Sequence, residues 1–472
     1  MHSVTVPPGV AAGHPATAAA GLEVLSDGGG AADAAVAATF ASCVAETIMT
    51  GLAGGGHALY WDSDRQVAHL VDCFVAVPGL DGEPARGESV EVDIVFGEQT
   101  VRYAIGAGSV GVPGVPAGCD TLWRRWGRLP WARLVEPALR LARDGVPLPP
   151  RHAECLLMVA PAMTHGEGAA IYAPGGRLLR ARERLRQPGM VRALELLRDE
   201  GADTFYTGSV ARALLRLMRD RGGVVTRADL RAYRTRCSSP AAEARFAGLR
   251  VASRRGLSGL LDTLPRLPVL ADATPGERAL AFARTLRGTD GFGDTTNVVA
   301  VDPEGNACVF TTSLGLGSGD FLPGLDLHLN SMLGETDLLR GPLEPGSRLG
   351  SMMSPTVALN GGGLALAAGA AGGSRIRSAL VQVLSGVLVE GLAPAAAVER
   401  PRLHPADAGD GAVRVHAEAG LEDAALDALD AAGYDVRRWS SRHHYFGGVS
   451  LVARDGAGGD SRRDGAALPL RG

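Results

Sequence analysis

Residues 294–311, DTTNVVAVDPEGNACVFT, carry the strongest indication of how this chain folds. Their Val, Thr and Phe content predicts two β-strands, and the Pro/Gly turn between them predicts a tight connection. Upstream, the alanine-rich residues 16–42 show helical spacing with a break at residues 28–30, and a strand is expected at residues 58–61. No Pro/Ser-rich linker separates the two halves of the chain, so we expect one large layered α/β unit.

Composition excludes several classes of function. The 472 residues carry a net charge of −4, which gives no indication of a nucleic-acid partner or of an anionic membrane surface. All 47 basic residues are arginine. Without lysine there is neither an internal Schiff base for pyridoxal phosphate nor a GxxxxGK phosphate loop. We therefore expect no cofactor.

The cysteines and the chain ends suggest a cytoplasmic protein. The six cysteines are scattered without a CxxC pair, which predicts reduced and mostly buried thiols. The first residues lack a basic and apolar signal pattern, and no uncharged apolar run reaches membrane-spanning length. The polar, glycine-rich residues 454–472 are expected to be largely mobile.

Two motifs favour structural roles over ligand binding. The glycine loop at residues 51–57 lacks GxGxxG spacing and follows a helix, so its glycines are expected to serve close backbone packing. The adjacent His443 and His444 point opposite ways on an extended chain and have no ligand partner at metal spacing. His57 and His328 are likewise expected to be structural, no Ser lies in a GxSxG elbow, and we predict no metal site.

Thr295 is the candidate nucleophile. If the bond between Asp294 and Thr295 is cut, Thr295 gains a free α-amino group with an ordinary pKa of about 7.7–8.0. That amine can accept the proton of its own hydroxyl, so the chemistry needs neither His nor Lys. Before the cut, the same hydroxyl can attack the carbonyl of Asp294 and release residues 1–294 and residues 295–472.

An oxyanion-binding turn is predicted at AAGAAGGSRIRSAL, residues 367–380. Gly372 and Gly373 can direct successive N–H groups to one point, and the helix expected to follow, over residues 377–399, adds its positive end.

In several blocks the sequence resembles the γ-glutamyltransferases, which are self-processing N-terminal nucleophile hydrolases. The resemblance covers nearly the whole chain and rests on GLAGGGHALYW, GVPGVPAG, DTFYTG, GGVVTRADLRAYR, DTTNVVAVDPEGNACVFTTSLGLGSG, GSMMSPTV and AGAAGGSRIRSAL, which occur in the family's order. It implies a four-layer αββα sandwich in which residues 1–294 and 295–472, the two products of self-cleavage, form one domain.

The resemblance implies a role for each matching catalytic residue. Thr295 would be the nucleophile and new N-terminus, and Asp294–Thr295 the cleavage site. Ser313 stands where the family has a threonine that hydrogen-bonds the nucleophile, and Gly372 and Gly373 would hold the oxyanion.

The sequence departs from the family in the substrate-binding residues. Phe74 or a neighbour replaces the arginine that clamps a glutamyl α-carboxylate, and charge-assisted bonds of that kind are worth roughly 1.5–3 kcal/mol each. Glu335 would hold the α-amino group, and Ser351 would be the remaining one of two substrate-binding serines. Three further positions lack the family's polar residue: Gly315, Met332 and Met352.

We therefore expect a threonine hydrolase or acyltransferase that acts on a non-glutamyl small molecule. One branch implied by the resemblance hydrolyses a carbon–carbon bond in the biosynthesis of 4-alkylproline units of antibiotics; an amidase or acylase is equally open. The alternatives are a conventional γ-glutamyl transferase or glutathione hydrolase and a non-catalytic scaffold. The expected partners are the small-molecule substrate and the two fragments of one precursor, with homo-oligomers open and no nucleic acid or membrane.

Overall fold

Two facing β-sheets form the centre of the molecule. The computed structural model describes residues 6–82, 87–96, 99–287, 295–339, 341–408 and 412–471. Over these residues the first sheet has seven strands: β22 (Ala466–Pro469), β1 (Gly9–Ala12), β11 (Thr296–Val301), β12 (Ala307–Ser313), β2 (Gly55–Asp62), β3 (Val67–Cys73) and β8 (Arg236–Ser238). The second sheet has six: β21 (Gly456–Gly459), β20 (Gly448–Ala453), β16 (Gly363–Ala371), β15 (Thr356–Asn360), β10 (Leu249–Ser253) and β9 (Ala242–Phe246). Within each sheet, neighbouring strands are antiparallel.

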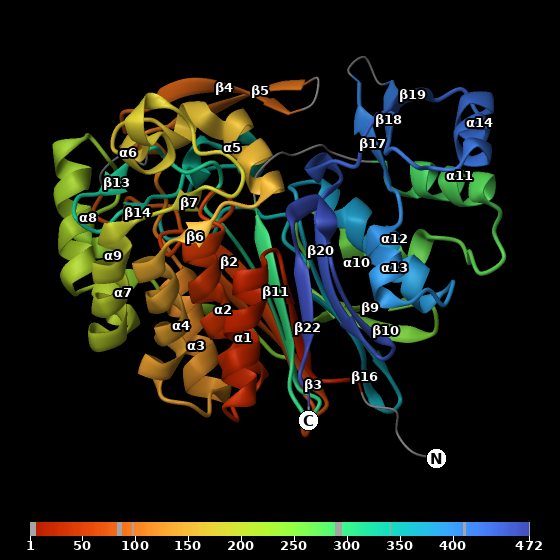
Figure 1. Cartoon of the computed structure of the whole chain (residues 1–472), viewed down its shortest axis with the longest axis horizontal. Helices are drawn as coiled ribbons and strands as arrows, with labels where there is room; N and C mark the ends of the chain where they lie inside the picture. The colour runs from red at the N-terminus through yellow and green to blue at the C-terminus, as the bar shows by residue number, and fades with distance from the viewer. Residues whose placement is uncertain are drawn as a thin grey trace.

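Helices cover the outer face of each sheet, which gives four layers (Figure 1). Against the first sheet lie α1 (Pro15–Ser26), α2 (Ala31–Ala45) and α3 (Val115–Trp126). Outside them, α4 (Trp131–Asp144) packs on α2 and on α7 (Pro188–Glu200), and α8 (Ser209–Asp220) packs on α7. Against the second lie α10 (Leu260–Thr263), α12 (Arg375–Leu388) and α13 (Pro394–Glu399). The predicted αββα sandwich is confirmed.

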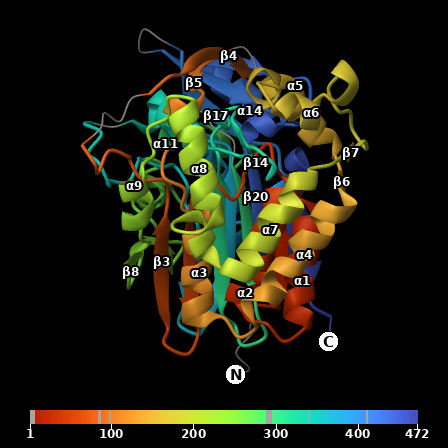
Figure 2. The same ribbon diagram turned by 90° about the vertical axis from the view of Figure 1, so that its left-hand side faces the viewer.

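Smaller elements surround the sandwich. Figure 2 shows β3, β8 and α9 (Arg227–Ala232) along one side of the molecule. The others are α5 (Pro150–Met163), α6 (Gly168–Tyr172), α11 (Pro275–Thr285) and α14 (Asp423–Ala431), with the strand sets β4 (Val90–Phe96) and β5 (Gln99–Ile105), β6 (Val146–Pro147) and β7 (Arg184–Leu185), β13 (Phe321–Leu322) and β14 (Leu327–His328), and β17 (Leu403–Asp407), β18 (Val413–Ala417) and β19 (Asp435–Arg438).

Strand β11 shows why both faces of the first sheet are apolar. Successive side chains on a strand point to opposite faces. Val298 packs into the core beneath α1 and α2, whereas Val299 packs into the core between the two sheets. Because each face is covered, the whole strand is buried, and its residues 298–301 are all apolar. The first sheet also combines β1, β2, β3 and β8 with the later β11, β12 and β22, so the two halves of the chain share one core.

Two sequence expectations were wrong. The helix expected at residues 377–399 is two helices, α12 and α13; it begins two residues earlier and breaks before Pro394, where Gly391 takes a φ of 70°. The tail expected to be mobile is built into the fold, because β21 joins the second sheet and β22 joins the first. Charges anchor it: Arg462 is fully buried and bonds the carboxylates of Glu418 and Asp460.

Replacing Arg462 with Gln is expected to lower the free energy of unfolding by about 3–5 kcal/mol, because it leaves the buried carboxylate of Glu418 without its guanidinium partner. Urea unfolding followed by circular dichroism measures the change. The control is Arg414→Gln, which breaks the exposed pair with Asp435 and should cost less than about 1 kcal/mol. Equal effects of the two substitutions would contradict the proposed anchoring.

Candidate active site

A small cavity of about 30 Å³ brings together most of the candidate residues. Its wall is formed by Phe74, Thr295, Ser313, Met332, Glu335, Leu338, Ser351, Met352, Met353, Gly373 and Ile376. Gly315 and Gly372 lie next to lining residues, and Asp294 lies outside the described residues. The roles of these residues in chemistry stay predictions, but one cavity contains residues from five distant parts of the sequence.

Thr295 lies at the entrance of β11 and is 4% exposed. The antiparallel register pairs Thr296 with Thr312, and continuing it by one residue places Thr295 opposite Ser313 at the end of β12. The Ser313 hydroxyl accepts a hydrogen bond of 2.8 Å from the N–H of Gly315. Sheet register therefore brings the two candidate hydroxyl groups to the same edge of the sandwich.

The glycine loop at residues 51–57 packs against this edge. A Cβ atom on Gly54 would lie 2.2 Å from the carbonyl oxygen of Ser313 and one on Gly56 would lie 2.4 Å from that of Thr311, so neither position admits a side chain. Close backbone packing, as expected from the sequence, explains these glycines.

Gly372 and Gly373 form the turn between β16 and α12. Their φ values of 121° and 59° lie in the region that favours glycine. Gly373 lines the cavity, and Ile376 in the first turn of α12 donates its N–H to the Gly373 carbonyl at 3.1 Å. The positive end of α12 thus lies beside Thr295, as an oxyanion site requires.

The wall opposite the hydroxyl groups is apolar. Phe74 stacks on His57 with ring centroids 5.4 Å apart. Its N–H donates to Asp72 at 2.9 Å, and its carbonyl accepts from the hydroxyl of Tyr233 at 2.7 Å. Phe74, Met332, Leu349 and Met353 belong to one apolar cluster. This is where the family resemblance implies a carboxylate clamp, and the structure places hydrocarbon there.

Glu335 is the acidic residue of the cavity wall, and it is 3% exposed. Gly315 makes room for it: a Cβ on that glycine, whose φ is 71°, would lie 1.9 Å from a carboxylate oxygen of Glu335. A larger residue at position 315 would therefore displace the carboxylate.

Two further residues hold the start of β11, beside the candidate nucleophile, and the sequence did not indicate them. Glu46, fully buried just after α2, accepts hydrogen bonds from the hydroxyls of Thr296 and Thr17. Arg463 donates to the carbonyl oxygen of Thr295 at 3.3 Å. Glu46 directly follows the mostly apolar residues 31–45. An acidic residue in such a position could have indicated a buried and hydrogen-bonded carboxylate. Arg463 was missed because its tail was expected to be mobile.

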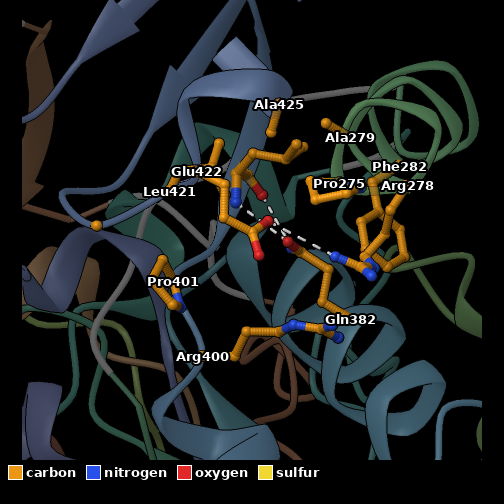
Figure 3. Close-up of a pocket in the computed structure, with 12 residues that line it drawn as sticks. Pro275, Arg278, Ala279, Phe282, Gln382, Arg400, Pro401, Leu421, Glu422 and Ala425 are labelled. Carbon is orange, nitrogen blue, oxygen red and sulfur yellow. Dashed lines mark hydrogen bonds and ion pairs between the residues drawn. The ribbon is translucent and has the colours of Figure 1, made fainter. Parts of the chain in front are cut away.

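A second cavity, of about 80 Å³, lies between α11, α12 and α14 (Figure 3). None of its lining residues carries a hydroxyl, thiol or imidazole. Arg278 and Arg400 both pair with Glu390, and the amide of Gln382 bonds the backbone of Leu403. Its polar groups are thus engaged with one another, and it has no group suited to covalent chemistry.

In the described part of the chain, no group of three or more His, Cys, Asp or Glu is arranged to hold a metal ion. No helix of the described residues is long and apolar enough to cross a membrane.

The four-layer fold and the threonine-lined edge define an N-terminal nucleophile type of sandwich. A family model for gamma-glutamyltranspeptidase matches residues 17–271 and 271–470. The chain belongs to the gamma-glutamyltranspeptidase family.

Characterised relatives extend over most of the chain. The Acylase ACY 1 proenzyme of Pseudomonas sp. (strain SE83) is 28% identical over 511 aligned residues, covering 94% of this chain and 89% of the relative. The glutathione hydrolase proenzyme of Bacillus subtilis (strain 168) is 25% identical, covering 98% and 91%. Both relatives are proenzymes, and one is an acylase whereas the other is a glutathione hydrolase.

Among solved structures, cephalosporin acylase from Bacillus halodurans superposes with a TM-score of 0.81 at 22% identity, over 99% of this chain and 96% of that chain. The protein LmbA2991HD gives a TM-score of 0.78 at 21% identity, over 98% and 99%. These likenesses confirm the fold.

The Glu46 carboxyl should make stability pH-dependent. Burial raises its pKa to about 7, and the bonds from Thr17 and Thr296 and the charge of Arg463 only partly oppose this. Between about pH 4.5 and 7 the folded chain then holds a proton that the unfolded chain has lost, so stability falls as pH rises, by roughly 3 kcal/mol in all. Glu46→Gln should remove this slope in urea unfolding measured across that range.

Glu344→Gln is the control for this measurement, because Glu344 is exposed. Its stability profile should run parallel to that of the wild type. If the stability profile of Glu46→Gln also ran parallel to that of the wild type, the buried carboxyl of Glu46 would not titrate as stated.

Proposed function

We propose that the chain is a self-processing hydrolase in which Thr295, freed by cleavage after Asp294, forms an acyl-enzyme with a small non-glutamyl substrate. The convergence of Thr295, Ser313 and Gly373 in one cavity carries this proposal. The three residues come from the start of β11, the end of β12 and the turn before α12, and their arrangement supplies a nucleophile, a hydroxyl partner and an oxyanion donor.

The residues divide the chemistry as follows. The α-amine of Thr295 accepts the hydroxyl proton, and the Thr295 oxygen attacks the substrate carbonyl. The N–H groups of Gly372 and Gly373 stabilise the oxyanion of the tetrahedral intermediate, which collapses to the ester as the leaving group takes up the proton. Water then attacks the ester by the same route. Arg463 and Glu46 fix the backbone at positions 295 and 296 and so hold the hydroxyl in its orientation.

The cavity wall favours an acyl group with a short apolar chain. Phe74, Met332 and Met352 occupy positions where the family resemblance implies polar contacts to a glutamyl group. Neither of the arginines that follow Gly373 in the sequence lines the cavity: Arg375 stacks on Tyr445 and Arg377 donates to the Leu286 carbonyl. Glu335 remains to accept a hydrogen bond from an amine or hydroxyl of the substrate. The acylase relative supports an acyl substrate, and an activated ketone carbonyl fits the same attack.

Thr295→Ala is expected to abolish both chain cleavage and turnover, because it removes the attacking oxygen of both reactions. Denaturing electrophoresis should show two bands for the wild type, residues 1–294 and 295–472, and one band for the variant. Thr295→Ser keeps a hydroxyl and is the matched control that should still cleave. Cleavage of the Thr295→Ala protein would contradict the mechanism. A single band for the wild type would favour the alternative of a non-catalytic scaffold.

Substrate preference separates an acylase from a conventional γ-glutamyl transferase. A short N-alkanoyl anilide should give a kcat/KM about 100-fold or more above that of a γ-glutamyl anilide, since at least two charge-assisted contacts to the glutamyl group are missing. Mass spectrometry should find the alkanoyl mass on fragment 295–472. Faster release from the γ-glutamyl anilide would establish the conventional activity instead.

A further inference from the structure

A basic cavity of about 160 Å³ lies behind the Phe74 wall, outside the catalytic cavity. One side is formed by residues 232–236, which connect α9 to β8, and the other by residues 76–80 and 346–348. Arg234, Arg236 and Arg348 line it, together with Tyr233 and Asp229. Its volume exceeds that of the catalytic cavity, so it admits a small ligand with several heavy atoms.

The positive charge of this cavity is not balanced by its own residues. Arg234 and Arg236 are exposed, and in the described part of the chain no carboxylate lies within ion-pair distance of either. Their guanidiniums donate instead to backbone carbonyls, Arg234 to Tyr233 at 2.6 Å and Arg236 to Gly346 at 3.2 Å. Each uses a single nitrogen for these bonds, which leaves further donors for a ligand.

The acidic residue of the wall, Asp229, does not neutralise the arginines. One of its oxygens accepts the N–H groups of Gly79 and Leu80, each at 2.9 Å. The other accepts from the N–H and the hydroxyl of Thr226 in the capping box of α9. The carboxylate is therefore occupied by four donors that fix the loop and the helix.

Arg348 supplies a fixed guanidinium at the back of the cavity. Its side chain is 9% exposed, and its Cζ lies 4.4 Å from the ring centroid of Tyr233. Its ionic contact with Asp72 is long, at 3.5 Å, and it also donates to the carbonyl of Arg234. Burial and stacking hold its orientation, so this group is preorganised for bidentate contact with a carboxylate or a phosphate.

We propose that Arg234, Arg236 and Arg348 form a binding site for an oxyanion, the phosphate or carboxylate group of a small molecule. Binding of the anion there affects the catalytic wall, the Phe74 side of the catalytic cavity. The link consists of direct contacts. Asp72 joins Arg348 to the backbone N–H of Phe74, and Tyr233 bonds the Phe74 carbonyl. The segments also pair directly, since Val77 donates to Ser347 at 2.9 Å and Gly346 donates to Val77 at 2.8 Å.

Calorimetric titration at fixed low ionic strength tests the site, with inorganic phosphate in one series and succinate in another. One saturable site is expected in the wild type, and the tighter of the two anions identifies the source of the oxyanion. The double variant Arg234→Gln/Arg236→Gln should bind the anion more weakly, by up to about tenfold. That is the loss of affinity expected for partly exposed charge-assisted bonds. Both side chains are exposed, so the variant should fold.

Arg186→Gln/Arg216→Gln is the matched control, because it removes the same charge from exposed arginines elsewhere and should leave the affinity unchanged. Absence of saturable binding of both anions, or equal weakening by the two double variants, would overturn the site. Hydrogen exchange tests the link: the bound anion should slow exchange at residues 72–80 and 345–350 but not in α5. Binding without that protection would overturn the coupling to the catalytic wall.

Discussion

The close approach of β11 to the second sheet is the constraint on which the candidate site depends. Gly369 of β16 faces Asn297 of β11, and a Cβ on that glycine would lie 2.9 Å from the Asn297 side-chain oxygen. The Asn297 amide also reaches the Gly448 carbonyl of β20, at 3.5 Å. Because glycine allows the sheets to meet here, Thr295 at the start of β11 lies beside Gly373, which follows the end of β16. A wider separation would place the proposed nucleophile too far from its proposed oxyanion site.

The start of β11, where the candidate nucleophile lies, is held by two side chains from outside the cavity. Glu46 reaches it from the end of α2 through Thr296, and Arg463 reaches it from the C-terminal segment through the Thr295 carbonyl. Self-cleavage would leave Thr295 at a new chain end, where backbone freedom is greatest. Bonds to the side chain of residue 296 and to the carbonyl of residue 295 survive such a cut, so they can keep the new terminus in place.

The apolar wall and the basic cavity behind it share the same short segments. Within residues 74–77, Phe74 lines the cavity that contains Thr295, whereas Ala76 and Val77 line the basic cavity. The apolar wall at Phe74 therefore has positively charged residues on its far side.

Local patterns in the sequence determined the paired helices before and after residues 28–30, the buried strands β11 and β12 and the glycine turn at residues 372–373, because periodicity and backbone freedom are properties of neighbouring residues. The order of the sequence blocks resembles that of a known family. This resemblance predicted the αββα sandwich and most of the residues that line the cavity around Thr295. Tertiary structure alone decided the placement of Glu46, Arg463 and the three arginines of the basic cavity. Their partners lie far away in the sequence, and burial of a charge depends on what the whole fold places around it.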